Sequence, residues 1–318
     1  MAIPKAYIAP IYFFLWYTLN IGYNIYNKKV MTALPLPLTM ACLQLAAGLI
    51  WILPLWLLGF RKKPVLSFED LKKLMPIVFF HTVGHSMTVI SLGAGAVSFT
   101  HIVKAAEPFF STILSAIILN VKQPWQVNVC LMPIVGGVAV ASLKELSFTW
   151  TSFGGAMGSN LSFAIRGIFS KKLMTSPVGE NMDPANLFAV LTIMSFTLML
   201  PFVIYWEGGE IEERLEEAYV VYGDKKEFQL HCLYAGLFYY LYNEVAYLAL
   251  GVVDSPTTHA VGNTIKRVVV LVASTVYFKT EMTNQSILGC TIAIGGVLLY
   301  SVVKDAYAQK KVEKEKAQ

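Results

Sequence analysis

The sequence predicts an all-α membrane protein with ten transmembrane helices arranged as two inverted five-helix repeats. Of its 318 residues, 56% are hydrophobic and only 14% are charged, whereas a soluble domain carries about 25% charged residues. The apolar residues gather in ten runs, each close to the roughly 20 residues that a helix needs to cross a bilayer. A similarity between the two halves of the chain predicts how these helices are related.

The ten predicted spans follow one another with mostly short connections. They cover 8–27, 36–59, 74–93, 97–119, 125–143, 150–170, 184–206, 229–250, 256–277 and 283–303. The second connection, around "FRKKPVLSFEDLKK", and the seventh, around "EGGEIEERLEEAYVVYGDKKEF", are longer. We expect the acidic seventh connection to be a solvated surface segment that is helical in part.

An even number of spans places both termini on one side of the membrane. The termini and the even-numbered connections hold twice as many Lys and Arg residues as the odd-numbered connections. The positive-inside rule therefore places both termini on the side from which the protein is inserted.

Two landmarks recur in the second half of the chain at a similar separation. "SFTHIVKAAEP" (98–108) resembles "PTTHAVGNTIK" (256–266), and "PIVGGVAVAS" (133–142) resembles "AIGGVLLYS" (293–301). The offset of about 158 residues maps the fourth span onto the ninth and the fifth onto the tenth. The repeating unit has five spans, and because five is odd the second copy must be inverted. Inverted repeats are typical of secondary transporters.

The repeat also defines the organisation of the chain. It predicts a first five-helix repeat at 1–148, a second at 149–305 and a charged C-terminal tail at 306–318. The glycine pairs at 136–137 and 295–296, together with Gly154 and Gly158, would allow close helix contact.

Four cations fall within predicted spans, where charged side chains are costly and indicate function. They are Lys104, Arg166, Lys266 and Arg267. Lys266 and Arg267, in "GNTIKRVVVLVAST", lie too deep to extend easily to the interface and have no obvious carboxylate neighbour in the sequence. An intrahelical pair with Glu107 is the alternative for Lys104, and an interfacial position is the alternative for Arg166.

The charge balance within the spans indicates an anionic substrate. The four cations face only two intramembrane carboxylates, Glu107 and Glu244. A carrier of cations would show the opposite sign. A phosphate ester supplies the missing negative charge and several acceptor oxygens, which Arg binds as a fork and Lys as a point charge.

Two further spans carry polar side chains on one face. His81, His85 and Thr88 follow each other at i, i+4 and i+7 in the third span, and Tyr239 and Tyr242 lie in "FYYLYNEVAY" of the eighth. Hydrogen bonding to substrate oxygens and simple packing are both open for them. A zinc site at the two histidines lacks a third ligand.

Other classes of function receive little support. The sequence has no Gly-rich phosphate loop, HExxH or GxSxG motif, so we expect no enzyme activity, no cofactor and no bound metal. A net charge of +5 is modest and gives no reason to expect a nucleic-acid partner. The four cysteines lie in apolar runs and are expected to be packing thiols.

Four stretches identify a resemblance. "AVSFTHIVKAAEPFFS" (97–112), "KELSFTWTSFGGAMGSNLSFAIRGIFSKK" (144–172), "FYYLYNEVAY" (238–247) and "THAVGNTIKRVVVLVAS" (258–274) resemble the plastidic phosphate translocators of the triose-phosphate/phosphate type, in the drug/metabolite transporter superfamily. The resemblance extends over nearly the whole chain. It implies strict exchange of inorganic phosphate for phosphorylated metabolites, and the "HxxxHxxT" and "FYxLYN" patterns favour the triose-phosphate and glucose-6-phosphate branches.

The resemblance also implies roles for single residues. Lys104, Lys266, Arg267 and Tyr242 match the residues that hold the phosphate-bearing part of the substrate, and His85, Thr88 and Arg166 match those that contact its other end. Glu244 departs from the family, which more often has Gln there, and this charge could alter substrate preference.

The implied protein is a membrane transporter that functions as a monomer in the lipid bilayer of a plastid envelope. The inner membrane is favoured. No Arg- and Ser-rich targeting segment precedes the first span, which leaves the outer membrane of a secondary plastid open. The alternatives are a nucleotide-sugar/nucleotide antiporter, a phosphoenolpyruvate- or hexose-phosphate-preferring translocator, an enzyme of phosphorylated lipids, and a phosphate uniporter.

Overall fold

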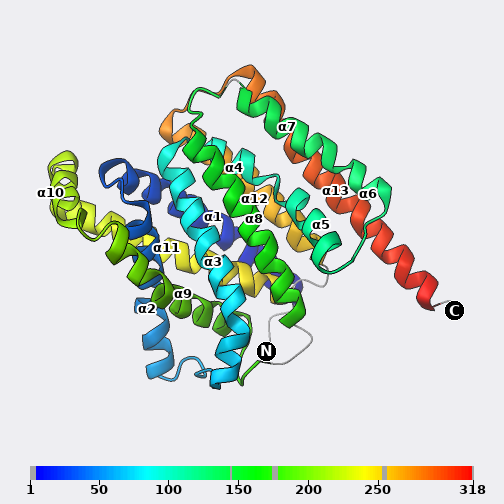
Figure 1. The fold of residues 1–318 in the computed structure, drawn as a ribbon, viewed down its shortest axis with the longest axis horizontal. Coiled ribbons are helices and arrows are strands. Elements are labelled where there is room, and N and C mark those ends of the chain that lie inside the picture. The colour runs from blue at the N-terminus through cyan, green and yellow to red at the C-terminus, as the bar shows by residue number, and fades with distance from the viewer. Residues whose placement is uncertain (1–4, 144, 174–177, 253–255, 317–318) are drawn as a thin grey trace.

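The computed structural model describes residues 5–143, 145–173, 178–252 and 256–316 (Figure 1). These residues form thirteen helices and no β-strand, so the all-α prediction is confirmed for them. The helices are α1 (Lys5–Ala33), α2 (Pro37–Leu57), α3 (Phe68–Ala94), α4 (Val97–Lys104), α5 (Glu107–Ile118), α6 (Trp125–Val129), α7 (Leu131–Leu143), α8 (Trp150–Leu173), α9 (Pro184–Trp206), α10 (Ile211–Tyr222), α11 (Lys225–Val252), α12 (Pro256–Phe278) and α13 (Asn284–Lys316).

Helix occupies each of the ten predicted spans within the described residues. Seven stretches are long and apolar enough to cross a membrane. They are Pro37–Leu57, Phe68–Ala94, Val97–Ile118, Trp125–Leu143, Pro184–Trp206, Val261–Phe278 and Asn284–Lys310. The other three predicted spans correspond to α1, α8 and α11, whose composition is more polar. The prediction of a polytopic helical membrane protein is thus confirmed, and the finer prediction of ten crossings is not.

Two of the predicted spans contain an interrupted helix. α4 ends at Lys104 and α5 begins at Glu107; α6 ends at Val129 and α7 begins shortly after it. Each interruption falls four residues before a proline, Pro108 or Pro133. A proline has no N–H to donate to the carbonyl four residues earlier, and its ring crowds that carbonyl. Proline alone is not sufficient, because α2, α3 and α9 continue through theirs.

Three helix pairs make the most extensive contacts: α1 with α11, α3 with α8, and α7 with α13. Figure 1 shows α7 and α13 side by side along one edge of the molecule. A Cβ on Gly137 would lie 2.4 Å from the backbone nitrogen of Ala293, and a Cβ on Gly289 would lie 2.3 Å from that of Ala141. Glycine therefore allows the two backbones to touch, as small residues do in membrane helix pairs.

The glycine predictions are correct only in part. Gly137 and Gly296 lie in the α7–α13 interface, but a Cβ on Gly136, Gly154 or Gly295 would meet nothing within 4 Å. In α8, the predicted Gly158 faces α3, where its Cβ would be 3.4 Å from Met87 Sδ, and Gly155, which was not predicted, lies closer, with its Cβ 2.8 Å from the Met87 carbonyl oxygen.

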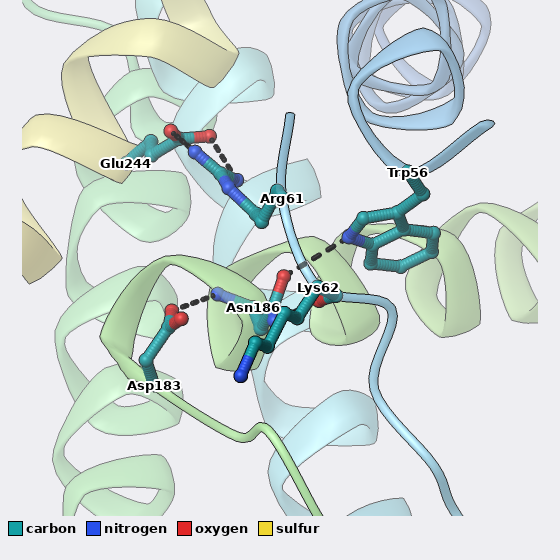
Figure 2. Close-up of polar contacts among 6 residues, drawn as sticks. All are labelled: Trp56, Arg61, Lys62, Asp183, Asn186 and Glu244. Atoms are coloured by element: carbon teal, nitrogen blue, oxygen red, sulfur yellow. Dashed lines mark hydrogen bonds and ion pairs between the residues drawn. The ribbon is translucent and has the colours of Figure 1, made fainter. Parts of the chain in front are cut away.

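Helices α2 and α9 are joined at both ends. At one end, Glu207 accepts hydrogen bonds from the backbone nitrogens of Leu38 and Thr39, at 3.0 and 2.6 Å, at the start of α2. At the other end, Trp56 Nε1 donates to Asn186 Oδ1 at 3.0 Å (Figure 2). Asn186 also donates to the Lys62 carbonyl at 2.8 Å. This pair therefore forms a fixed part of the frame.

The long seventh connection contains α10, as expected for a partly helical segment. α10 ends at Gly223, whose φ of 78° is the left-handed conformation that glycine adopts at helix ends. All four cysteines are free; Cys232 is half-buried and the other three are buried.

Candidate functional site

A cavity of about 800 Å³ lies between α1, α3, α4, α8, α11 and α12. All seven residues for which the sequence predicted substrate contact line its wall. They are His85, Thr88, Lys104, Arg166, Tyr242, Lys266 and Arg267. Residues from distant parts of the chain thus converge on one cavity.

Lys104 is the last residue of α4 and its ammonium group lies between α3 and α8. Nζ donates to Thr88 Oγ1 at 3.2 Å and to Ser159 Oγ, and these two hydroxyls are 2.8 Å apart. Nζ also lies 4.8 Å from the centre of the Phe163 ring. The alternative of a pair with Glu107 on one continuous helix is wrong, because the chain turns at Ala105 and Glu107 begins α5.

Arg166 contacts the same Phe163 ring as Lys104. Its guanidinium carbon lies 4.7 Å from the Phe163 ring centre, and Nη1 donates to His81 Nδ1 at 2.9 Å. Because His81 Nδ1 accepts this bond, Nε2 carries the proton and contacts the Tyr239 hydroxyl at 3.4 Å. Arg166 therefore faces the cavity rather than the membrane interface.

Lys266 and Arg267 have different surroundings although they are adjacent. Arg267 Nη2 lies 2.6 Å from Glu107 Oε2, while Nη1 is buried without a hydrogen-bond partner among the described residues. Lys266 Nζ lies 4.8 Å from the centre of the Trp16 ring. The expectation that neither cation has a carboxylate neighbour is thus wrong for Arg267, whose partner comes from another helix.

Histidine and tyrosine side chains form one wall of the cavity. The His85 ring stacks on Tyr239 with centres 4.1 Å apart, and its Nε2 donates to the Ala41 carbonyl at 3.3 Å. The Tyr242 ring lies 5.3 Å from that of Tyr23 and 5.9 Å from that of Tyr239. These ring contacts fix the orientation of His85 and Tyr242, both of which are predicted to contact the substrate.

Glu244 does not line the cavity. Its carboxylate is 95% buried and receives two hydrogen bonds from Arg61, one of them at 3.3 Å (Figure 2). Arg61 comes from the connection after α2. The sequence-based charge balance therefore needs correction: Glu244 is neutralised outside the cavity, and among the described residues the lining has four cations and one carboxylate, that of Glu107.

The cavity extends toward the side that holds the connection between α8 and α9. Val178, Met182 and Gly251 line it there. On the opposite side, Lys28 Nζ donates to three carbonyl oxygens at the end of α3, those of Leu92, Gly93 and Gly95, at 3.1, 3.1 and 2.8 Å. This contact links α1 to the α3–α4 corner beyond the cavity.

Three lining or supporting residues were not predicted from the sequence. Ser159 and Phe163 precede Arg166 by seven and three residues on α8, so a helical-face analysis starting from Arg166 would have found them. Trp16 carried no signal, because a tryptophan in an apolar run is ordinary. Its role depends on the packing of α1 against α12.

Comparison with known proteins identifies the family of this chain. The family described as "Triose-phosphate Transporter family" matches residues 8–301. Phosphoenolpyruvate/phosphate translocator 1, chloroplastic, of Arabidopsis thaliana is 42% identical over 92% of this chain and 71% of its own length. Triose phosphate/phosphate translocator, chloroplastic, of Solanum tuberosum is 40% identical over 96% of this chain and 72% of its own length.

Two further comparisons extend these findings. Glucose-6-phosphate/phosphate translocator 1, chloroplastic, of Arabidopsis thaliana is 41% identical over 92% of this chain and 74% of its own length. One crystal structure at 12% identity superposes with a TM-score of 0.51 over 95% of this chain and 98% of its own, which shows a shared fold. With the family match covering nearly all of the sequence and relatives above 40% identity, this chain belongs to the Triose-phosphate Transporter family.

Proposed function

We propose that this chain is a secondary antiporter of a plastid envelope membrane that exchanges inorganic phosphate for phosphorylated C3 metabolites, such as triose phosphate and 3-phosphoglycerate. It is a transporter and not an enzyme, as are the translocators that it resembles. One observation carries the proposal: the described residues that line the cavity include four cations and one carboxylate.

The charge of the empty cavity accounts for obligatory exchange. Glu107 compensates Arg267, but among the described residues Lys104, Arg166 and Lys266 form no ion pair and contact hydroxyl, imidazole or aromatic groups. Closing a protein around uncompensated ions costs several kcal/mol per ion. A bound phosphate or phosphate ester removes most of this cost, so the transporter changes its access only when loaded.

The cavity wall contains residues for both parts of a phosphorylated substrate. Lys104, Lys266, Arg267 and Tyr242 hold the phosphate group. His85, Thr88 and Arg166 contact the rest of the molecule. The hydrogen bond between Lys104 and Thr88 supports a site in which these two sets are adjacent.

The transport path is built from ten membrane crossings in two inverted repeats, 1–148 and 149–305. The helix contacts support this arrangement. A repeat of five spans exchanges the first span with the sixth and the third with the eighth, and the α1–α11 and α3–α8 pairs are then equivalent. The α7–α13 pair, from the fifth and tenth spans, is equivalent to itself. Movement of one repeat against the other alternates access to the cavity.

The counter-substrate and the membrane are assigned by resemblance. The phosphoenolpyruvate, triose-phosphate and glucose-6-phosphate translocators have nearly equal identities to this chain, so phosphoenolpyruvate and hexose phosphates remain the competing counter-substrates. The inner envelope membrane is proposed from the chloroplastic relatives. A monomer in the lipid bilayer fits a cavity that is formed within one chain.

Uptake of labelled phosphate into proteoliposomes tests the proposal. Vesicles are loaded with phosphate, dihydroxyacetone phosphate, 3-phosphoglycerate, phosphoenolpyruvate, glucose 6-phosphate, a nucleotide monophosphate or buffer alone. Uptake only into vesicles loaded with phosphate or phosphorylated metabolites is expected. Uptake into buffer-loaded vesicles would indicate a uniporter, and uptake dependent on nucleotide alone would indicate a nucleotide-sugar transporter. Lys266→Ala should abolish exchange without unfolding the protein.

A further inference from the structure

We propose that Trp16 is a positioning residue that holds the ammonium group of Lys266 over its ring, so that Lys266 keeps its full charge for the substrate. This inference rests on the proposed function. Trp16 lies on α1, far from Lys266 in the sequence, and only 3% of its surface is exposed. Both residues line the cavity.

Lys266 lies against an aromatic ring. Among the described residues, no carboxylate lies within ion-pair distance of its Nζ, whereas the Trp16 ring centre is 4.8 Å away. Trp gives the strongest cation–π interaction of the aromatic side chains, and the interaction strengthens when the pair is desolvated. The Trp16 ring therefore supplies an electrostatic partner for an ammonium group in an otherwise apolar part of α12.

The contact between α1 and α12 places the Trp16 ring beside Lys266. The Tyr17 hydroxyl donates to the Gly262 carbonyl at 2.8 Å, one helical turn before Lys266. A Cβ on Gly262 would lie 2.2 Å from Phe13 Cε1, so only glycine lets the Phe13 ring approach this closely. Phe13, Trp16 and Tyr17 are in mutual ring contact, with centres 5.9 to 6.1 Å apart. The glycine of "GNTIKR" thus allows α1 to pack closely beside Lys266.

An aromatic partner stabilises Lys266 without competing with the substrate. A carboxylate in this position would neutralise Lys266 and would compete with the phosphate, as Glu107 does for Arg267. A ring face stabilises the cation without adding a negative charge. The same arrangement occurs at Phe163, which contacts both Lys104 and Arg166. In this cavity, aromatic faces hold cations in place and leave their charge available.

Two replacements of Trp16 distinguish the effect of the aromatic ring from the effect of side-chain size. We expect Trp16→Leu to raise the KM for phosphate in phosphate/phosphate exchange by about tenfold, with a smaller change in kcat. Trp16→Phe retains a ring face and should recover most of the affinity. Trp51→Leu is the control, because Trp51 is 40% exposed on α2 and does not line the cavity. Equal KM values for wild type and Trp16→Leu, or equal losses in Trp16→Leu and Trp16→Phe, would overturn the proposal.

A second measurement does not depend on transport. Lysines of the purified full chain are reductively methylated with ¹³C, and the Lys266 signal is identified by its absence in Lys266→Arg. A methyl group over an indole face is shifted upfield by the ring current. The shift should be present in wild type and lost in Trp16→Leu. A Lys266 signal at the position of exposed lysines in wild type would overturn the proposal. If wild type shows the shift but exchanges no phosphate, the proposed function fails and not this contact.

Discussion

Glu107 at the start of α5 and Arg267 in the middle of α12 form an ion pair of 2.6 Å on the wall of the cavity. The pair joins the two halves of the chain. Within the described part of the cavity lining, it also commits the one carboxylate to one of the four cations. A substrate phosphate that approaches Arg267 must therefore compete with Glu107 or share the guanidinium with it.

Glu107→Gln is expected to destabilise the empty protein and to increase its stabilisation by phosphate. Removing one partner of a buried pair leaves the other uncompensated; because Glu107 is 31% exposed, we expect a loss of roughly 1–3 kcal/mol. Bound phosphate restores a partner for Arg267. The measurement is the Tm of the purified protein with and without saturating phosphate, and a phosphate-induced shift no larger than that of wild type would contradict the competition.

The Arg61–Glu244 pair provides the control for charge loss away from the cavity. Glu244→Gln should lower the Tm, because the buried Arg61 guanidinium loses its acceptor. It should leave the phosphate-induced shift and the order of preferred counter-substrates unchanged, because Glu244 is not part of the cavity lining. A changed order of counter-substrates would restore the interpretation that this glutamate acts on specificity.

A charge exchange at the same pair tests whether its contribution is electrostatic. Arg61→Glu and Glu244→Arg should each lower the Tm, because each places two like charges together in a buried position. The double variant restores opposite charges and should recover a substantial part of the loss. A double variant as unstable as the sum of the single variants would show that geometry, and not charge, determines this contact.

The sequence predicted the positions of the helices better than the ion pairs between distant segments. Hydrophobic runs located each span, because the bilayer demands about 20 apolar residues irrespective of tertiary structure. It also located the seven cavity residues, since buried charges and resemblance both pointed to them. It missed that Glu107 pairs with Arg267 and Glu244 with Arg61, because ion pairs between distant segments depend on how helices cross.

The interruptions of α4–α5 and α6–α7 show a second limit of prediction. Pro108 and Pro133 are visible in the sequence, yet prolines in α2, α3 and α9 leave those helices continuous. Neighbouring helices decide whether the freed carbonyl is accommodated or the helix turns. The place of Lys104 at the end of a helix therefore follows from packing, not from local sequence.

The α7–α13 interface should be sensitive to a single methyl group. A Cβ on Gly289 would lie 2.3 Å from the Ala141 backbone nitrogen, which cannot move aside alone. Gly289→Ala should therefore cost about 1–3 kcal/mol through overpacking. Gly295→Ala on the same helix meets nothing within 4 Å and should stabilise by up to about 1 kcal/mol through helix propensity. Thermal unfolding of the two variants checks the sign difference, and equal effects would refute the close contact.

Lys28 determines how firmly the α3–α4 corner is held on the side opposite the connection between α8 and α9. Its ammonium hydrogens are directed to three carbonyl oxygens at the end of α3, where helix carbonyls lack intrahelical partners and the helix dipole is negative. α2 and α9, in contrast, are hydrogen-bonded to each other at both ends. Release of Lys28 is therefore expected to let the α3–α4 corner move while the α2–α9 frame stays in place.

Lys28→Met should increase access to the cavity from the side of the α3–α4 corner. Leu92 lines the cavity, its carbonyl accepts one of the Lys28 hydrogen bonds, and it is 1% exposed, so Leu92→Cys provides the reporter. We expect faster labelling by a membrane-impermeant maleimide added on that side when Lys28→Met is combined with it. Lys29→Met is the matched control, because Lys29 lies over the Tyr26 and Tyr277 rings and donates to no carbonyl oxygen among the described residues. Equal labelling in the Lys28 and Lys29 variants would show that the three hydrogen bonds do not hold the cavity closed.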